Sequence, residues 1–373
     1  MFHTKVNFMP PDISFVLGTR PEIIKLSPII RECERRDIEI SILHTGQHYS
    51  ENLDRVFFEQ LRLPEPDHNL EVGSAPHGRQ TGEMMAGIES VLEDESPEYV
   101  FVQGDTNSVL AGSVAACKME SIEVCHVEAG LRSYDMEMPE EINRRLSDHV
   151  SDHHFAPTEE SRDNLLAENI PETKITVTGN TIVDAVEENT RIAREESDVL
   201  DELGLDGPFA LLTAHRAENV DNEKRFVTLL EGVSRAARKH DLTVVYPIHP
   251  RAKERVSEFS IDVPSEIKVV EPQEFLDFLV LEAEAEVVFT DSGGVQEETC
   301  VLRTPCVTLR DNTERPETVD VGANLVVGVK PDDIIKGADK MMDRDRDWKN
   351  PFGDGTAAKK ILDTLGLKGE SGG

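Results

Sequence analysis

Positive charge is scarce in this 373-residue chain: 39 Lys and Arg stand against 73 Asp and Glu, a formal net charge of −34 at pH 7. A chain so acidic is a poor candidate for general nucleic-acid binding, which needs clustered basic residues. The acidic residues are spread along the sequence and indicate a solvated, self-repelling surface. We expect a protein that works in very salty cytoplasm; equal stability and activity in dilute buffer and in molar salt would contradict this.

Cysteine and long apolar runs are also scarce. The five cysteines are odd in number and form no C-x-x-C pair, which argues against a disulfide framework and a zinc site. No apolar run approaches the roughly 20 residues that span a bilayer. Residues 1–11 lack the charged-then-apolar pattern of a signal peptide. We therefore expect a cytoplasmic protein with no membrane segment and no metal centre.

Short apolar runs alternate with amphipathic stretches, which is the pattern of a parallel sheet with helices on both faces. In the first part of the chain the predicted strands are Ile13–Leu17, Ile38–His44, Tyr99–Val102, Val124–Val127 and Ile175–Val177. The predicted helices between them include Pro21–Arg35, His77–Leu92 and Glu159–Glu168. A second set of strands is predicted at Phe209–Thr213, Thr243–Ile248, Lys268–Val270, Val287–Thr290, Cys306–Thr308 and Leu325–Val327.

The strand pattern starts afresh after a long charged stretch at Val183–Leu203. The chain is long enough for two units of roughly 150–200 residues each. A last predicted helix, Thr356–Leu365, is expected to cross back to the first unit. We therefore predict an α/β fold with two Rossmann-like domains and a cleft between them: residues 1–181 with 356–373, and residues 182–355.

Ligands of open parallel sheets bind beyond the carboxyl ends of the strands, so the residues after each predicted strand are the most informative. Arg20 follows the first strand beside a helix N-terminus, where backbone N–H groups attract anions, and Lys25 lies one turn further on. Phosphate binding and plain surface exposure both fit these two residues. Neither predicted domain begins with G-x-G-x-x-G, which argues against a dehydrogenase.

Carboxylates follow the next strands. Asp105 and Glu128 come directly after two predicted strands, and Glu140 follows a loop that carries Arg132. Carboxylates that converge on one cleft can serve as general acid and base, because repulsion and burial raise some of their pKa values toward neutrality. The alternative is structural: Asp105 caps the following helix and Glu140 only opens its own. The pattern alone leaves both interpretations open.

Basic residues and a glycine pair follow the strands of the second part. His215 and Arg216 come after one strand, and His249 and Arg251 come after the next, where the two pairs would bring positive charge to a diphosphate. Residues 291–298 give the strongest local signal, because a Ser-Gly-Gly turn opens a helix there and so builds an anion site. Glu298, one turn into that helix, is placed to accept hydrogen bonds from ribose hydroxyls.

Taken in order, nine motifs resemble those of the non-hydrolysing UDP-N-acetylglucosamine 2-epimerases. They lie at residues 18–22, 45–48, 103–106, 126–132, 139–144, 178–181, 215–219, 291–298 and 310–317. The resemblance runs from about residue 13 to about residue 365. It implies a glycosyltransferase-B-like fold, a homodimer, and interconversion of UDP-N-acetylglucosamine and UDP-N-acetylmannosamine without a redox cofactor.

The resemblance also implies a reaction course: UDP is eliminated to give a 2-acetamidoglucal, C2 is reprotonated from the other face, and UDP is added back. No carbonyl flanks the C2 proton, so its removal must be coupled to departure of UDP, and the site needs carboxylates around the sugar and donors to UDP. The implied catalytic residues are Asp105, Glu128, Glu140 and His215. The implied substrate-binding residues are Arg20, Lys25, Gln273, Phe278, Ser292, Gly293, Gly294, Glu298 and Arg315.

Bacterial members of the family bind a second substrate molecule as an activator. Position 50 is Ser where the bacterial pattern has Gln, and the loop between Glu128 and Pro139 is shorter, so activation stays open for this chain. The positions that match the activator site are Gln47, Arg79, Glu141, Arg216 and His249.

Four other functions stay open on the sequence alone. A hydrolysing 2-epimerase, which releases UDP and free N-acetylmannosamine, shares the fold and the elimination step, so motifs separate it only weakly. A glycosyltransferase of the same fold would need an acceptor groove. The set of carboxylates argues against a non-catalytic sugar-nucleotide sensor. A 2-epimerase of a 2,3-diacetamido uronic acid would differ in sugar contacts that the sequence does not assign.

Overall fold

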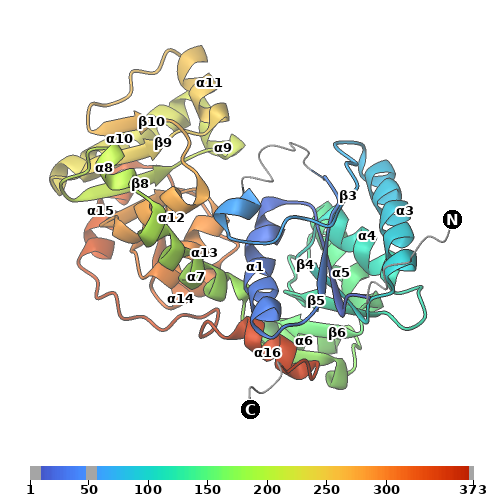
Figure 1. Ribbon diagram of the computed structural model, residues 1–373. Coiled ribbons are helices and arrows are strands. Elements are labelled where there is room, and N and C mark those ends of the chain that lie inside the picture. The colour runs from blue at the N-terminus through green and yellow to red at the C-terminus, as the bar shows by residue number, and fades with distance from the viewer. Residues whose placement is uncertain (1–9, 48–56, 369–373) are drawn as a thin grey trace. The chain divides into compact units, whose positions relative to one another are not determined.

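The computed structural model describes residues 10–47 and 57–368 (Figure 1). This part of the chain forms two compact α/β units. One runs up to Ala185 and includes the residues from Phe352 on, and the other runs from Val186 to Pro351. Helix α7, Thr181–Glu196, begins in the first and ends in the second. The domain limits predicted above, 1–181 with 356–373 and 182–355, remain a proposal about which parts fold independently.

The first unit is built on a parallel sheet whose strands run in the order β3-β2-β1-β4-β5-β6-β7. The strand order reverses between β1 and β4, which is where such sheets bind ligands. Every residue of β1 and β4 is buried, because helices cover both faces of the sheet. The strands are β1 (Ile13–Leu17), β2 (Ile40–His44), β3 (His68–Asn69), β4 (Tyr99–Gln103), β5 (Glu123–Val127), β6 (His153–Ala156) and β7 (Ile175–Val177).

Helices α1 and α16 pack together on one face of this sheet, and α3, α4 and α5 pack in succession on the other (Figure 1). Helix α3 buries one residue per turn from Gln80 to Leu92. Helix α4 is buried almost all round and lies close to the sheet: a Cβ on Gly112 would be 2.9 Å from a methyl of Val102. The helices are α1 (Arg20–Arg35), α3 (His77–Glu95), α4 (Asn107–Ala116), α5 (Pro139–Val150), α6 (Glu159–Ala167), a 3₁₀ turn (Glu172–Lys174) and α16 (Ala357–Thr364).

The second unit repeats this plan with a parallel sheet in the order β10-β9-β8-β11-β12-β13, and its order reverses between β8 and β11. Helices α10 and α15 pack together and share one apolar core with the sheet, while α12 packs against α8 and α13. The strands are β8 (Phe209–Thr213), β9 (Thr243–Pro247), β10 (Ile267–Val270), β11 (Val287–Thr290), β12 (Cys306–Thr308) and β13 (Asn324–Val326). The helices are α8 (Val199–Glu202), α9 (Ala217–Val220), α10 (Glu223–Lys239), α11 (Pro250–Glu258), α12 (Phe275–Glu284), α13 (Gly293–Leu302), α14 (Pro316–Asp320) and α15 (Pro331–Met342).

Two strands fall outside the predicted set. β6 has the sequence His-His-Phe-Ala, which does not read as an apolar run, and it is held in the sheet by pairing with β5 and β7. β3 has only two residues. The predicted strand Ile38–His44 begins later, at Ile40. All five cysteines are free thiols. In the described part of the chain, no helix is both long and apolar enough to cross a membrane.

The C-terminal helix α16 is fixed to the first unit at both ends. The carboxylate of Asp184 accepts hydrogen bonds from the N–H groups of Ala357 and Ala358, at 3.2 and 3.0 Å. At the other end, Arg36 donates to the carbonyl of Leu367 at 2.6 Å. Asp184 thus takes up two of the N–H groups that a helix leaves without partners at its start.

Replacing Asp184 with Ala should loosen α16, because two buried N–H groups lose their acceptor. We expect a loss of about 1–2 kcal/mol in unfolding free energy and faster amide exchange in residues 357–364. Hydrogen–deuterium exchange read by mass spectrometry measures the second effect. Asp354→Ala removes an exposed ion pair with Lys360 of the same helix and should cost less than about 0.5 kcal/mol. Equal exchange in the two variants would contradict the capping role of Asp184.

Candidate functional site

The loop between β1 and α1 packs tightly against two other loops at the strand ends. A Cβ on Gly18 would lie 2.0 Å from Oγ1 of Thr45 and 2.4 Å from Oγ of Ser108, so only Gly fits. Close packing, rather than a tight turn, therefore requires this glycine. Arg20 opens α1, as the sequence predicts, and its guanidinium carbon lies 5.7 Å from the ring centre of Phe57.

Glu22 is a buried carboxyl in the first of the nine motifs, but it is not among the predicted site residues. Its Oε2 accepts from the N–H of Gly18 at 2.8 Å, and its Oε1 accepts from Oγ1 of Thr106 at 2.5 Å. Burial raises the pKa of Glu22 to about 7, although these hydrogen bonds act in the opposite direction. Glu22 therefore ties the loop that carries Arg20 to the loop that carries Asp105.

Glu128 follows β5 and is surrounded by donors. Lys25 donates to both carboxylate oxygens at 2.7 and 2.8 Å, Asn180 donates at 3.0 Å, and Gln103 donates to Oε2. These donors match an ionised carboxylate, which has only acceptor sites. The backbone φ of Glu128 is +68°, a strained value for a residue with a side chain, and such strain collects at functional sites.

Asp105 follows β4 and faces the start of α5. Its Oδ2 lies 2.5 Å from a guanidinium nitrogen of Arg144. Helix α4 is capped by Thr106, whose Oγ1 accepts from the N–H of Val109, so the interpretation of Asp105 as a helix cap is wrong. Glu140 lies one turn before Arg144, exposed in the first turn of α5. The structure thus brings Asp105 to the same helix that carries Glu140.

A buried ionic cluster lies behind these loops. Asp148 of α5 accepts from Nδ1 of His126 and from Arg132, both at 2.7 Å. The other ring nitrogen of His126 donates to the carbonyl of Gly104 at 2.9 Å, so both nitrogens carry hydrogen and the ring is charged. Burial opposes these charges, but the attraction between them raises the pKa of His126 and lowers that of Asp148. The cluster fixes the backbone just before Asp105.

Two residues that match the activator site are built into the framework of the first unit. The side-chain oxygen of Gln47 accepts from the N–H and the hydroxyl of Ser108, at 3.1 and 2.8 Å. Glu141 is buried and accepts from the N–H of Ser133 at 2.9 Å and from Arg144 at 3.0 Å. Burial opposes its ionisation, but these donors lower the pKa of Glu141 to about 2. Both side chains therefore have a structural role in the first unit.

Asp291 organises the strand-end loops of the second unit. Its buried carboxylate accepts from the N–H groups of His215 and Arg216, at 3.1 and 3.0 Å, and from the amide of Asn219 at 3.0 Å. Burial opposes the charge of Asp291, but these donors lower its pKa. Nδ1 of His215 lies 3.2 Å from Oδ1 of Asp291, which makes Nδ1 the protonated nitrogen and turns Nε2 away from the carboxylate.

His249 caps helix α11, because its Nδ1 accepts from the N–H of Arg251 at 3.2 Å. Its ring centre lies 5.4 Å from that of His215. Burial and the neighbouring His215 lower the pKa of His249. Arg251 is paired with Asp221 at 3.1 Å. Of the two basic pairs predicted for a diphosphate, the second is therefore tied to structural partners.

Helix α13 starts directly after β11, at the turn predicted to bind an anion. Ser292 is the N-cap, but its hydroxyl makes no capping hydrogen bond, and the first turn carries no acidic residue. A Cβ on Gly293 or Gly294 would meet nothing closer than 3.9 Å, so the space beside these residues is open. This arrangement is the one in which helix N-termini bind phosphate.

The residues predicted on the nucleoside side lie on α12, α13 and the loop before α12. Gln273 donates to the carbonyl of Glu271 at 2.7 Å. Phe278 is half-buried on α12, and Glu298 is half-buried on α13. Because α12 packs against α13, these side chains belong to neighbouring helices of one unit.

Two arginines follow β12 and have carboxylate partners. Arg315 lies 2.6 Å from Glu297 of α13 and remains part-exposed. Arg310 is buried and donates to both carboxylate oxygens of Glu314, at 2.6 and 2.8 Å. Arg310 therefore has a structural role, whereas Arg315 is a part-exposed residue paired with α13.

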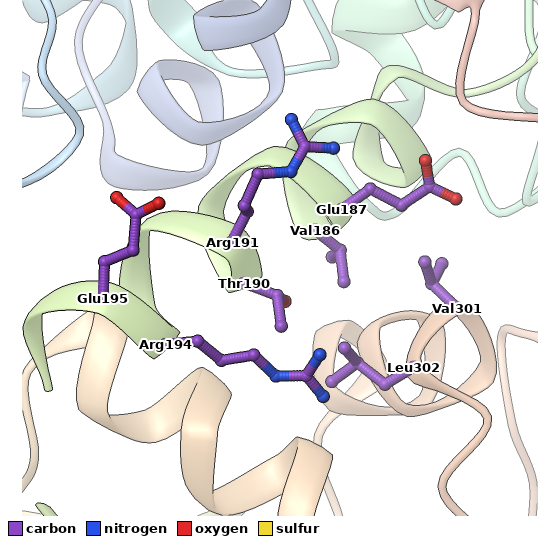
Figure 2. A pocket seen from close by; sticks show the side chains of 8 residues that line it. All are labelled: Val186, Glu187, Thr190, Arg191, Arg194, Glu195, Val301 and Leu302. Carbon is purple, nitrogen blue, oxygen red and sulfur yellow. The ribbon is translucent and has the colours of Figure 1, made fainter.

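A surface hollow of the second unit lies away from these residues. Figure 2 shows Val186, Thr190 and Arg194 of α7 facing Val301 and Leu302 at the end of α13. None of the candidate site residues lines it. Among residues 10–47 and 57–368, no three His, Cys, Asp or Glu side chains are grouped as metal ligands would be.

Comparison with known proteins shows the family of this chain. A family model described as UDP-N-acetylglucosamine 2-epimerase matches residues 31–366. The UDP-N-acetylglucosamine 2-epimerase of Methanocaldococcus jannaschii is 53% identical over 360 residues, which cover 95% of this chain and 98% of that protein. The chain belongs to the UDP-N-acetylglucosamine 2-epimerase family.

Solved structures of this family have the same fold. The crystal structure of the Methanocaldococcus jannaschii UDP-GlcNAc 2-epimerase in complex with UDP-GlcNAc and UDP has a TM-score of 0.81 to this chain, at 53% identity, and covers 95% of this chain and 99% of that chain. The predicted α/β class, with two Rossmann-like units of the glycosyltransferase-B type, is confirmed. A relative from Pseudomonas aeruginosa, named UDP-2,3-diacetamido-2,3-dideoxy-D-glucuronate 2-epimerase, is 38% identical over 94% of this chain and 98% of that protein.

Glu22→Gln should change how the stability of this epimerase-family chain depends on pH. Folding raises the pKa of Glu22 from 4.5 to about 7. Its contribution to stability is therefore fully present below about pH 4.5 and is lost as the pH rises through about 7, by an amount on the order of 3 kcal/mol. The variant lacks this loss, so its denaturation midpoint relative to wild type should rise between pH 5 and 8.

The control for Glu22→Gln is Glu34→Gln, which changes an exposed carboxylate on the same helix, α1. Urea unfolding across the pH range measures both variants. Parallel pH curves for wild type and Glu22→Gln would contradict the assignment of a buried, neutral-pH carboxyl at position 22.

Proposed function

We propose that this chain is a non-hydrolysing epimerase that interconverts UDP-N-acetylglucosamine and UDP-N-acetylmannosamine. The observation that carries the proposal is the 53% identity, over almost the whole chain, to a relative named for 2-epimerisation of UDP-N-acetylglucosamine. A crystal structure of that relative holds UDP-GlcNAc and UDP. The clustering of carboxylates and cations at the strand ends of both units supports it.

The proposed reaction breaks two bonds in its first half. A base takes the proton from C2 of the sugar, the C1–O bond to UDP breaks, and a double bond forms between C1 and C2. In the second half an acid returns a proton to the opposite face of C2, and an oxygen of UDP rebuilds the bond to C1. Stabilisation of the departing diphosphate lowers the barrier to both halves.

The first unit is proposed to act on the sugar. Asp105, Glu128 and Glu140 are its carboxylates, and they differ in surroundings: Glu128 has Lys25 as partner, Asp105 has Arg144, and Glu140 is exposed. Proton transfer at C2 requires a carboxylate on each face of the sugar ring. We assign this pair of roles to the three residues together, with Arg20 at the N-terminus of α1 as an anion contact.

The second unit is proposed to hold UDP. Ser292, Gly293 and Gly294 would bind a phosphate at the start of α13. His215, oriented by Asp291 through Nδ1, would contact the diphosphate through Nε2. The remaining contacts proposed for the nucleotide and the sugar are Gln273, Phe278, Glu298 and Arg315.

Product analysis separates this proposal from hydrolysis. Incubation with UDP-N-acetylglucosamine, followed by anion-exchange chromatography, should give an equilibrium mixture of two UDP-sugars. UDP together with free N-acetylmannosamine would instead place the chain with the hydrolysing 2-epimerases. Transfer of the sugar only after an acceptor is added would favour a glycosyltransferase, and binding without turnover would favour a sensor.

A second substrate class has support in one comparison. The Pseudomonas aeruginosa relative is named for a 2,3-diacetamido uronic acid, but it is 38% identical, against 53% for the relative named for UDP-N-acetylglucosamine. The larger identity favours the simpler sugar. Faster turnover of the diacetamido uronic acid than of UDP-N-acetylglucosamine would reverse this preference.

Activation by a second substrate molecule stays a prediction of the resemblance. Gln47 and Glu141 already have internal partners, and Arg79 is exposed on α3. His48 and Ser50, which belong to the same motif region, lie outside the described residues. A hyperbolic dependence of the forward rate on substrate concentration would contradict activation.

We further propose a homodimer that works in a salty cytoplasm. Among the described residues, five of the seven large apolar side chains that are exposed lie on one loop and the helix after it, α5: Tyr134, Met136, Met138, Ile142 and Leu146. An exposed patch of this kind marks an interaction surface. Light scattering in molar salt should give twice the mass of the chain, and a monomer would contradict the proposal.

Asp105→Asn, Glu128→Gln and Glu140→Gln should each lower turnover by at least about 10²-fold, because each removes a carboxylate proposed to move or stabilise a proton. Turnover is read from the initial rate of UDP-sugar interconversion, with circular dichroism to confirm folding. Glu93→Gln, an exposed carboxylate near the end of α3, is the control and should leave the rate unchanged. A near-normal rate in any one of the three would remove that residue from the catalytic set.

A further inference from the structure

Glu282 of α12 is a carboxyl placed where water does not reach it. Its relative exposure is 0%. In the described part of the chain, no hydrogen-bond donor reaches either of its carboxyl oxygens. A buried carboxylate without a donor is among the least favourable groups in a protein interior, so this one must be neutral.

The neighbour of Glu282 is another carboxyl, that of Glu298 on α13, which packs against α12. Burial first, and then the charge of Glu298, raise the pKa of Glu282 well above its ordinary value. A second titratable neighbour is the thiol of Cys306, at the start of β12, and it is buried too. Two carboxyls in contact, with one of them fully buried, share one proton.

The two carboxyls do not hold the shared proton equally. Glu282 is fully buried, whereas Glu298 is half-buried and has access to water. The charge therefore stays on Glu298, and the proton stays on Glu282 and forms an O–H···O bond to it. This bond holds the carboxylate of Glu298 in a fixed orientation on α13.

We propose that Glu282 is a positioning residue: it donates its proton to Glu298 and so orients that carboxylate to accept hydrogen bonds from the ribose hydroxyls of the UDP-sugar. The inference rests on the proposed function, which puts the ribose at Glu298. In this role Glu282 touches no substrate and acts only through Glu298. The preference of the site for a ribose over a deoxyribose therefore depends on Glu282, which lies on the neighbouring helix.

Titration calorimetry with UDP, 2′-deoxy-UDP and 3′-deoxy-UDP tests this role. Wild type should bind UDP at least roughly tenfold more tightly than one of the deoxy analogues, because a site built to bond a hydroxyl rejects a ligand that lacks it. Glu282→Leu, which fills the space without a donor, should lose most of that preference and bind UDP roughly tenfold more weakly.

Glu282→Gln supplies the matching rescue, since its amide N–H can donate to Glu298 in place of the carboxyl proton. It should keep the preference for UDP over the deoxy analogues. Glu284→Gln, at the end of the same helix and away from Glu298, controls for the removal of one carboxylate and should bind all three ligands as wild type does. If Glu282→Leu does not fold, Glu282→Met, with an unbranched apolar side chain of similar length, takes its place.

The outcomes separate this inference from the proposed function. An unchanged preference in the apolar variant overturns the positioning role, and so does loss of the preference in Glu282→Gln. Loss in Glu282→Leu with rescue in Glu282→Gln supports it. Turnover of UDP-N-acetylglucosamine is measured on the same wild-type preparation. If wild type turns over the substrate and Glu282→Leu keeps the preference for UDP, only the role of Glu282 is overturned. If wild type neither turns over the substrate nor binds UDP, the proposed function is overturned as well.

Discussion

A buried carboxylate behind the strand ends holds the loops of each unit, and the candidate site depends on it. In the first unit Asp148 binds the charged ring of His126, whose other nitrogen fixes the carbonyl of Gly104. In the second unit Asp291 takes the N–H groups that follow β8 and orients His215. A buried charge that loses its partner is strongly unfavourable, so neither loop moves without breaking its cluster.

The same principle places the basic residues of the candidate site. With a net charge of −34, the protein as a whole repels a UDP-sugar, and attraction has to be local. Lys25 and Arg315 are each paired with a buried glutamate, Glu128 and Glu297. These pairs hold the two cations at the strand ends in fixed positions.

Much of the fold is readable from the sequence, because buried parallel strands appear as short apolar runs and because turns and helix starts have local signals. β6 is not predicted, because two histidines take up half of its four residues and no apolar run is visible. It is identified as a strand only by its pairing with β5 and β7. Residues after strands, such as Asp105 in the first unit and Ser292 in the second, can be singled out because strand ends are predictable and each parallel sheet gathers such residues at its own edge.

The residues that the sequence does not reveal are charged groups with distant partners. Glu22 meets Thr106, which is 84 positions away, and Asp148 meets His126 across two elements. Glu282 is surrounded by apolar neighbours in sequence and reads as an exposed residue of a helix. Their burial depends on how helices pack on the sheet, which periodicity within one segment does not record. The same holds for Gly18, because only the structure shows that Thr45 and Ser108 leave no room for a Cβ at this position.

We propose that the strand-end loops carry out chemistry at C2 of the sugar, coupled to departure of UDP. Proton NMR of the purified protein with UDP-N-acetylglucosamine in deuterated water at high salt tests it most directly. The account predicts that UDP-N-acetylmannosamine appears with deuterium at C2 and that the C2 proton of the remaining substrate exchanges. An unchanged substrate that keeps its C2 proton would contradict it.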